Sequence, residues 1–468
     1  MCYDPRVSLI VGKRCAMLSV RKKILHIAGP IVLENVLVFS ASLVTTAMVG
    51  RLSSMDITAQ NISTRLVNTL MLLFKGMGVG VTVVTAYAHA RGNEARCART
   101  LHRTLSAALP LSFVLTALVF ARPRLFISAF TSDAAIMAAT EWYMRAMGFV
   151  IPIICAHHLL VGSFNGHGET RIPMYSAVVV NLVNIVLGYV LIFGHLGVPA
   201  LGIRGAACAY ITAQAVGLAL LIVVRWKKHL PAVSASDDAT GPVLGEVLSV
   251  GVPSALEGIM YNVALILLSR ALLPYGTDSF AAYQLGGQAE NICYMVGMAF
   301  VTTSTTLAAL AVGRRDGELY LAYFKELFRL GTVVAGASAV ILLFLPEQLM
   351  GLLTDKRTLI DIGKYYLYAM VPAQFPQIYN NILIGFLRSS GYKRVPMFII
   401  AAGLWCVRVP VAVVTGLVLH GSILWIWAGI ALDQFTRLAL LGLFYRKKRV
   451  IGGTIEVFAG GTNEASQG

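Results

Sequence analysis

Four acidic residues of this 468-residue chain, Glu34, Glu257, Glu290 and Asp433, lie inside long apolar runs. An ionised acid at the centre of a bilayer costs about 2.5 to 3.5 kcal/mol, so four of them would cost on the order of 10 kcal/mol, as much as the stability of a whole domain. Such residues need a charged partner, an aqueous cavity or a functional role. Because an apolar environment disfavours the charged form of a carboxyl group, a buried acid can take up a proton at cellular pH. These four residues are therefore candidates for binding a proton or an organic cation.

Two of the four acids have basic residues within reach in the sequence. Asp433 has Arg437 one helical turn away and Arg408 in the preceding apolar run, which favours a structural charge pair that braces two helices. Glu34 could be neutralised by Lys75 of the second apolar run. The sequence thus predicts a structural role for Asp433 and leaves a pairing for Glu34 open.

The other two acids, Glu257 and Glu290, have no basic residue nearby in the sequence. Both a coupling or substrate-binding role and a hydrogen-bonded structural role remain open for them. Aromatic rings and thioethers suit flat organic cations, although such side chains also fill ordinary helix contacts. The residues of this kind near the two acids include Tyr261, Tyr283 and Met295.

The elements that carry these acids are predicted to be membrane-spanning helices. The chain is 57% hydrophobic and 13% charged, with a mean hydropathy of +0.74, whereas soluble domains have about 25% charged residues. Apolar runs long enough to span a bilayer recur along the chain, without the alternation of a membrane barrel strand. We predict an all-α polytopic membrane protein with twelve transmembrane helices, near residues 24–49, 60–90, 104–120, 138–163, 172–194, 203–225, 244–273, 279–312, 328–346, 360–387, 395–419 and 422–445.

The chain contains two copies of one unit. The stretch Gly162–Met174 returns 223 residues later as Gly385–Met397 with its Gly, Arg, Pro and Met positions kept, and the same offset pairs Glu34 with Glu257. Each stretch is predicted to be a tight loop between two membrane helices, with its Pro opening the second helix. We expect two six-helix lobes that superimpose by a rotation near 180° about the membrane normal, with the paired acids at equivalent depths.

The basic residues predict the orientation of the helices. The net charge is +16, yet Lys and Arg lie at the ends of the apolar runs, which favours membrane topology over nucleic-acid binding. The side that carries the N-terminal arm has 25 of them and the opposite side has eight. We therefore predict a multi-pass protein of the plasma (inner) membrane with both termini in the cytoplasm. The lipid bilayer and small-molecule substrates are its expected partners, nucleic acid is not, and we expect a monomer.

The predicted domain organisation follows from these runs. We assign residues 1–23 to a cytoplasmic arm, 24–228 to an N-terminal lobe, 229–242 to a cytoplasmic linker, 243–447 to a C-terminal lobe and 448–468 to a polar cytoplasmic tail. The seven cysteines are scattered singly, so the sequence predicts neither a disulfide framework nor a metal site. No cofactor is expected besides a coupling ion.

An ordered series of short motifs resembles a known family. The series begins with Pro30-Ile-Val-Leu-Glu34-Asn and Met48-Val-Gly-Arg-Leu52, continues through Asn181–Gly194 and Pro199–Ala207, and ends with Leu387-Arg-Ser-Ser-Gly391 and Trp425-Ile-Trp. Together these motifs resemble the multidrug and toxic compound extrusion (MATE) family over roughly residues 24 to 445. The resemblance implies a twelve-helix exporter with a V-shaped cleft between its lobes, which expels organic cations in exchange for protons or sodium.

The sequence departs from the family pattern where the coupling ion would bind. Thr45 and Gln377 stand where members often have Asp, and Glu257 follows Pro253 by four residues where the usual spacing to the Glu is about eight. The family's coupling site therefore cannot be transferred residue by residue. Physical reasoning favours proton coupling through Glu257 or Glu290, with sodium as the second hypothesis because sodium needs several converging oxygens.

Two other functions remain as alternatives. A flippase for lipid-linked precursors has a similar lobed architecture, but it would line its cleft with many basic residues, and few lie mid-span here: Arg65, Lys75, Arg145, Arg408 and Arg437. An intramembrane enzyme is less favoured, because the spans contain no GxSxG or HExxH arrangement. We predict a secondary active transporter and not an enzyme.

Overall fold

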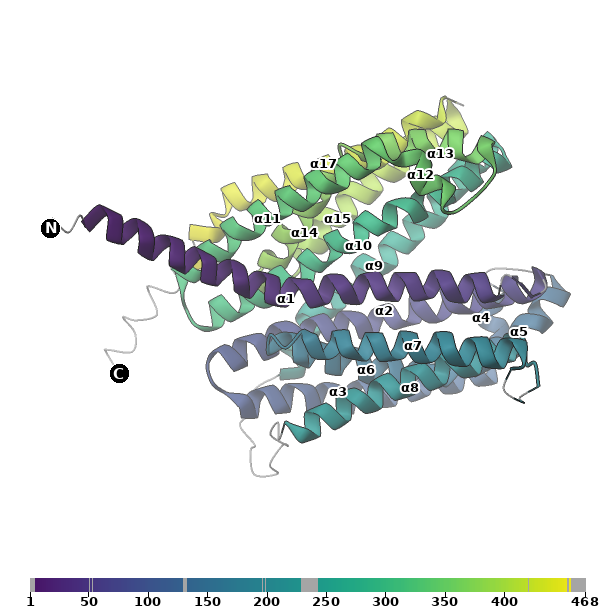
Figure 1. The fold of residues 1–468 in the computed structure, drawn as a ribbon, viewed down its shortest axis with the longest axis horizontal. Helices are drawn as coiled ribbons and strands as arrows, with labels where there is room; N and C mark the ends of the chain where they lie inside the picture. The colour runs from purple at the N-terminus through teal and green to yellow at the C-terminus, as the bar shows by residue number, and fades with distance from the viewer. Residues whose placement is uncertain are drawn as a thin grey trace. The chain divides into compact units, whose positions relative to one another are not determined.

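The computed structural model describes residues 5–49, 51–52, 54–128, 133–195, 197, 199–228, 243–419, 421–452 and 454–455, with side chains from Ser19 onward. Every regular element in these ranges is a helix, as the sequence predicted, and no strand occurs among them (Figure 1). The predicted linker 229–242 and most of the predicted tail lie outside the described residues.

The chain forms two compact units. The first, here called the N-unit, consists of Leu33–Ile259, and the second, the C-unit, consists of Met1–Val32 together with Met260–Gly468. The N-unit contains the later part of α1 (Pro5–Val49), all of α2 (Ser54–Ala90), α3 (Glu94–Ala121), α4 (Pro123–Ile127), α5 (Ala134–Gly148), α6 (Val150–Gly166), α7 (Arg171–Phe193) and α8 (Ile203–Lys227), and the first part of α9 (Val243–Leu272). The C-unit contains α10 (Thr277–Gly313), α11 (Gly317–Phe344), α12 (Pro346–Gly351), α13 (Arg357–Met370), α14 (Gln374–Ser389), α15 (Val395–Gly403), α16 (Val409–Val413) and α17 (Ile423–Lys447).

The helix bounds repeat at the predicted offset of 223 residues. Helices α2 and α3 return as α10 and α11 with identical bounds at that offset, and α5 and α6 return as α13 and α14. The backbone repeats as well, since Gly168 and Gly391 both have a positive φ, of 77° and 88°. The two halves of the chain are therefore copies in helix order and in turn geometry, whereas the rotation that relates them stays a prediction.

Among the described residues, ten helices are long and apolar enough to cross a membrane. The helices α5 and α6, which are bent by 43° at their junction, give an eleventh span if they are counted together. The predicted span at residues 360–387 corresponds to α13 and α14, which are shorter and more polar. These two helices are the counterparts of the bent pair. Both repeats thus contain one broken helix at the same place, and its break explains the difference from twelve continuous spans.

The turns in the structure are shorter than the loops that the sequence predicts at Gly162–Met174 and Gly385–Met397. Gly162 lies inside α6 and Gly385 inside α14, and neither is part of a turn. A Cβ atom on Gly162 would lie 2.3 Å from the carbonyl oxygen of Gly78 in α2. These glycines recur because two helices approach each other closely there, and only the residues after Gly166 and Ser389 form the turns.

The first helix of each repeat is divided between the two units. Ile24, Ile27 and Ile31 of α1 belong to a core cluster of the C-unit. Conversely, Val247 of α9 belongs to the main core cluster of the N-unit, and Gly76 of α2 lies against the backbone of α9 there. The units therefore differ from the predicted lobes, 24–228 and 243–447, by exchanging the first half of these two helices.

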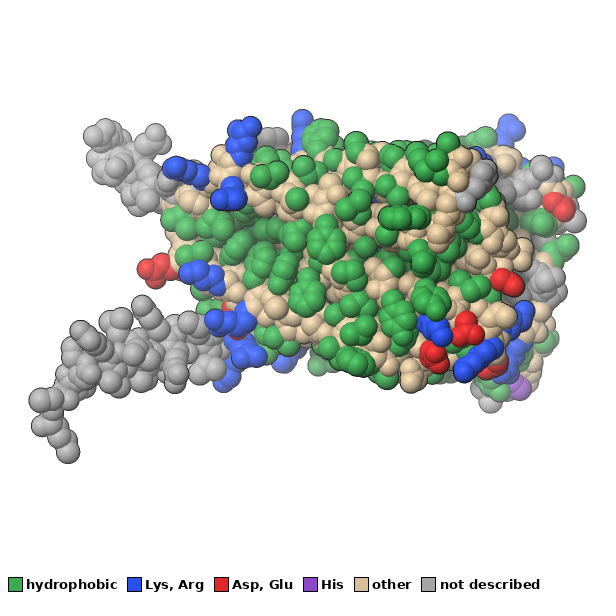
Figure 2. Space-filling model, turned by 90° about the horizontal axis from the view of Figure 1, so that it is seen from above, with side chains coloured by type: hydrophobic (Ala, Val, Ile, Leu, Met, Phe, Trp, Pro, Cys, Tyr) green, Lys and Arg blue, Asp and Glu red, His purple; other side chains and the backbone are tan. Residues whose placement is uncertain are grey.

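Large apolar side chains are exposed along the helices of both units. Figure 2 shows apolar side chains over the middle of one face, with Lys and Arg toward its ends. Such extensive exposed apolar surface is unfavourable in water and favourable against lipid. Examples that are more than half exposed are Phe113, Val114, Leu182, Phe344, Phe398 and Leu443.

Candidate functional site

A buried charge cluster occupies the C-unit. Asp433 of α17 is fully buried and has two basic partners. Nε of Arg408 lies 2.9 Å from Oδ2 of Asp433, and Arg437 donates hydrogen bonds to both carboxylate oxygens, at 2.7 and 2.5 Å. The two arginines that the sequence assigned to a structural charge pair thus both contact Asp433. The cluster contains one more positive than negative charge.

The backbone around Arg408 explains how this cluster is assembled. Residues Leu404–Arg408 form a π-helical segment, in which the N–H of Val409 donates to the carbonyl of Leu404. Pro410 lies two residues after Arg408, and because proline lacks an N–H it cannot make an ordinary α-helical hydrogen bond there. Such segments often occur at functional sites. Gly403 leaves the necessary space, since a Cβ atom there would lie 2.2 Å from Oδ1 of Asp433.

Aromatic side chains of the C-unit surround the cluster. The guanidinium of Arg408 lies 5.7 Å from the ring centre of Tyr261, a cation–π distance. The rings of Tyr283 and Tyr366 meet edge to face at 5.5 Å, and Tyr366 meets Trp427 in the same way at 5.8 Å. Arg408 also acts electrostatically on Tyr283, so Tyr261 and Tyr283, both candidates from the sequence, belong to one aromatic and basic environment.

Glu290 of α10 lies at the edge of this environment. Its Oε2 accepts a hydrogen bond of 2.7 Å from the hydroxyl of Tyr366, and Gln374 is a further hydrogen-bond partner. Arg408 acts on it electrostatically. Glu290 is half-buried, as is Met295 five residues further along α10. An ionised Glu290 balances the extra positive charge of the Asp433 cluster, so its protonation would change the net charge of this region from zero to +1.

The two acids paired by the repeat offset both lie in the N-unit, in different surroundings. Glu34 of α1 is half-buried, and the charge of Lys75 on α2 acts on it. Glu257 of α9 is buried, and its neighbour Gly258 lies against Leu72 of α2. The two equivalent acids thus have different neighbouring residues on α2.

Thr45 and Gln377, the two positions where family members often have Asp, differ in their surroundings: Thr45 makes a hydrogen bond and Gln377 is buried. The side-chain amide of Asn184 in α7 donates a hydrogen bond of 3.0 Å to the hydroxyl of Thr45. Gln377 lies buried in α14. At these two positions the chain has side chains without a titratable group.

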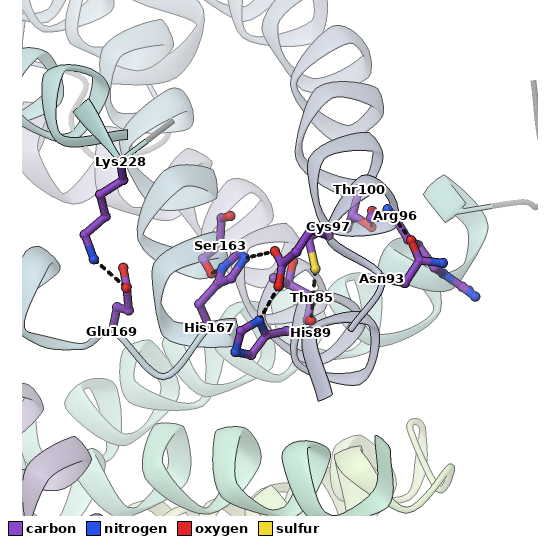
Figure 3. Close-up of polar contacts among 11 residues, drawn as sticks. Thr85, His89, Asn93, Arg96, Cys97, Thr100, Ser163, His167, Glu169 and Lys228 are labelled. Atoms are coloured by element: carbon purple, nitrogen blue, oxygen red, sulfur yellow. Dashed lines mark hydrogen bonds and ion pairs between the residues drawn. The ribbon is translucent and has the colours of Figure 1, made fainter. Parts of the chain in front are cut away.

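One polar cluster of the N-unit was missed by the sequence analysis. His89 of α2, Glu94 of α3 and His167 of the turn after α6 offer ligand atoms that lie within 4.8 Å of one another. Nδ1 of His89 and Nε2 of His167, both labelled in Figure 3, lie 2.6 and 3.2 Å from the carboxylate oxygens of Glu94. The spacing of His89 and Glu94 across a Gly-Asn turn was visible in the sequence, but His167 is more than 70 residues away. Only the packing of α6 on α2 and α3 joins them.

Comparison with known proteins agrees with this fold. The sequence matches the MatE family over residues 30–190 and 253–414, one stretch in each repeat. The chain is 26% identical to the probable multidrug resistance protein NorM of Thermotoga maritima, covering 91% of this chain and 92% of the relative. It is also 26% identical to the probable multidrug resistance protein YoeA of Bacillus subtilis, covering 91% and 94%.

Solved structures show the same fold. An outward-facing multidrug resistance MATE family transporter of the MOP superfamily superimposes with a TM-score of 0.84 at 18% identity, covering 93% of this chain and 97% of the other. A MOP superfamily transporter from Pyrococcus furiosus superimposes with a TM-score of 0.83 at 18% identity, covering 93% and 96%. The two stretches that match the family cover more than half of the chain. The chain belongs to the MatE family, the multidrug and toxic compound extrusion transporters.

Proposed function

We propose that the protein is a secondary active multidrug efflux transporter that exports lipophilic organic cations in exchange for protons. Family membership supports export, and so do the names of its relatives, which are probable multidrug resistance proteins. The observation that carries the choice of proton and cation is the position of Glu290, a half-buried acid with a tyrosine hydroxyl and aromatic rings beside it. In this proposal Glu290 is the coupling residue.

The charge of the surroundings supports competition between proton and cation at Glu290. Two arginines and Asp433 leave one positive charge, which an ionised Glu290 neutralises. A bound organic cation would face an ionised Glu290, and a proton arriving from the outer side would neutralise that carboxylate and weaken the attraction. A one-for-one exchange moves no net charge across the membrane, so the pH gradient alone would drive it. The two repeats would expose the site alternately to each side.

The same proposal assigns an orientation. We infer that the protein lies in the plasma (inner) membrane with both termini in the cytoplasm. The support is the excess of Lys and Arg on the side of the termini, including Arg446 to Arg449 at the end of α17. Positive loops remain on the cytoplasmic side during insertion.

A vesicle assay tests the function. Purified protein in liposomes should export a fluorescent lipophilic cation when a pH gradient is imposed, and an anionic dye should not be exported. Glu290→Gln keeps the shape of the side chain and removes its titration, so pH-driven export should fall to the level of protein-free vesicles while equilibrium binding of the dye changes less. Glu257→Gln tests the second candidate acid in the same way.

Controls separate the parts of this proposal. Glu141→Gln changes an acid in the middle of α5 that contacts Arg124 and Arg145, and it should leave export unchanged. Export driven by a sodium gradient and not by a pH gradient would replace the proton with sodium. Export at the wild-type rate by both Glu290→Gln and Glu257→Gln would refute the assignment of the coupling residue, and transport of anions alone would refute the substrate class.

A further inference from the structure

We propose that His89, Glu94 and His167 form a binding site for a divalent transition-metal ion of the Zn²⁺ class. The three residues come from three helix ends of the N-unit: the last turn of α2, the first residue of α3 and the turn that follows α6. The site is remote in sequence from Glu290 and has no part in the exchange proposed above. Two imidazoles and a carboxylate form a donor set that suits Zn²⁺ and its neighbours in the first transition row.

The distances within the cluster suit such an ion. Nε2 of His167 lies 3.2 Å from Oε2 of Glu94. Two ligand atoms at that separation, each about 2.1 Å from a metal, subtend an angle of about 100°, close to tetrahedral. Nδ1 of His89 lies 2.6 Å from Oε1 of Glu94. For both atoms to bind one metal ion at a near-tetrahedral angle, they must move apart by less than about 1 Å. Glu94 is 38% exposed, so its side chain has room to rotate and water can reach a fourth position.

The hydrogen bonding of His167 points to a cation at this place. Its Nδ1 lies 2.8 Å from the backbone carbonyl of Ser163, and because a carbonyl only accepts, Nδ1 must carry the hydrogen. In the neutral ring Nε2 then presents a lone pair toward the carboxylate of Glu94, so that two acceptors face each other and need a cation between them, either a proton or a metal ion. A metal ion between them satisfies both. A backbone carbonyl that accepts from one ring nitrogen and so orients the other nitrogen toward the ion is typical of histidines in metal sites.

Two basic side chains of this region, Arg96 and Lys228, pair with acids other than Glu94. Arg96 donates to both carboxylate oxygens of Glu246 at 2.8 Å, and Lys228 pairs with Glu169 (Figure 3). The negative charge of Glu94 therefore remains directed at the two histidines. An incoming divalent ion would meet one carboxylate and two imidazoles.

The internal repeat shows that the fold does not require this cluster. At the offset of 223 residues, Val312, Gly317 and Ser390 stand in place of His89, Glu94 and His167. The turn itself is the same in both repeats, since Asn93 caps α3 and Asp316 caps α11 through the same backbone position. A purely structural role would be expected in both copies, whereas the ligand set occurs only in the first.

Cobalt titration of the full-length protein, purified without a histidine tag, tests the site. Co²⁺ should bind with a stoichiometry of one and give the visible absorption of tetrahedral coordination, and Zn²⁺ should displace it and raise the Tm. His89→Val and His167→Ser introduce the residues that the second repeat has at these positions, so folding should survive. Either variant should lose the absorption and most of the affinity. His102→Ala, which removes an exposed histidine of α3, should bind like the wild type.

Several results would overturn the proposal. Absence of Co²⁺ binding by the wild type at millimolar concentration would mean that the cluster is only a hydrogen-bonded relay. Equal binding by wild type, His89→Val and His167→Ser would place the ion elsewhere. If a histidine variant misfolds, Glu94→Gln keeps the size of the side chain and removes its charge, and unchanged binding by that variant would equally refute the site. Loss of metal binding with pH-driven export intact would separate this site from the coupling residue.

Discussion

At the scale of single residues, two buried arginines of the C-unit, Arg408 and Arg437, depend on one carboxylate. Asp433 contacts both Arg408 and Arg437, so its removal leaves two guanidinium groups in an apolar region. A buried charge that loses its only strong partner is far more destabilising than a broken surface pair, because nothing replaces the water that the ion has lost. The same residue indirectly affects Glu290, since Arg408 acts on both.

Asp433→Asn should therefore destabilise the protein by about 3 to 5 kcal/mol, a large part of the total stability of an ordinary domain. The measurement is thermal unfolding of the purified protein in detergent. Glu141→Gln is the matched control, because it breaks contacts with the more exposed Arg124 and Arg145 and should cost at most about 1 kcal/mol. Similar shifts in Tm for the two variants would show that the cluster does not brace the helices.

At the scale of helices, close approach between backbones determines how the broken helix of each repeat packs. Gly162 of α6 allows contact with α2, and Gly385 of α14 allows contact with α10. In membranes, small residues at such contacts contribute through van der Waals packing, since lipid provides no hydrophobic driving force between helices. The recurrence of glycine at both places follows from this shared geometry.

Gly162→Ala and Gly385→Ala should each destabilise the protein, by roughly 1 to 3 kcal/mol, because the added methyl group forces the helices apart. A Cβ atom at Gly162 would lie 2.3 Å from a carbonyl oxygen, and one at Gly385 would lie 1.9 Å from the hydroxyl of Ser304. Gly336→Ala in α11 adds the same methyl group into open space and should be neutral or stabilising by up to about 1 kcal/mol. Thermal unfolding compares the three, and equal stability of all variants would contradict the close packing.

At the scale of the whole molecule, the chain consists of two repeats, and the first helix of each repeat, α1 or α9, is divided between the two compact units. Each compact unit contains most of one repeat and the first half of the first helix of the other. The core of the C-unit thus includes Ile24, Ile27 and Ile31 of α1, and the core of the N-unit includes Val243 and Val247 of α9. Neither repeat has its full core by itself.

We therefore expect the two repeats to be unstable alone and stable together. Residues 1–235 and 236–468, expressed separately, should each be degraded or aggregate, because each lacks part of its core. Co-expression should yield a complex that binds the fluorescent cation. Residues 33–468 should fail for the same reason, although only a short segment is removed. A stable, correctly inserted second repeat in the absence of the first would show that the exchange is not needed for stability.

Much of this architecture was predicted from the sequence because it depends on local properties. Apolar length defines a membrane helix, and a fixed offset between Pro, Arg and Gly positions reveals a repeat without knowledge of packing. The pairing of Asp433 with Arg437 was equally local, since residues one turn apart share a helix face. The family resemblance rested on motifs in the same order along the chain.

Tertiary structure alone decided which distant side chains meet. Tyr366 bonds to Glu290 from 76 positions away, and His167 reaches Glu94 from 73 positions away. Periodicity along one helix gives the face of a residue but not the neighbour that covers it. For the same reason the sequence predicts Gly162 in a turn, whereas it lies inside α6 and its role depends on α2, which packs against it. The partners of a buried polar group are determined by the packing of helices, and that packing is a property of the folded chain.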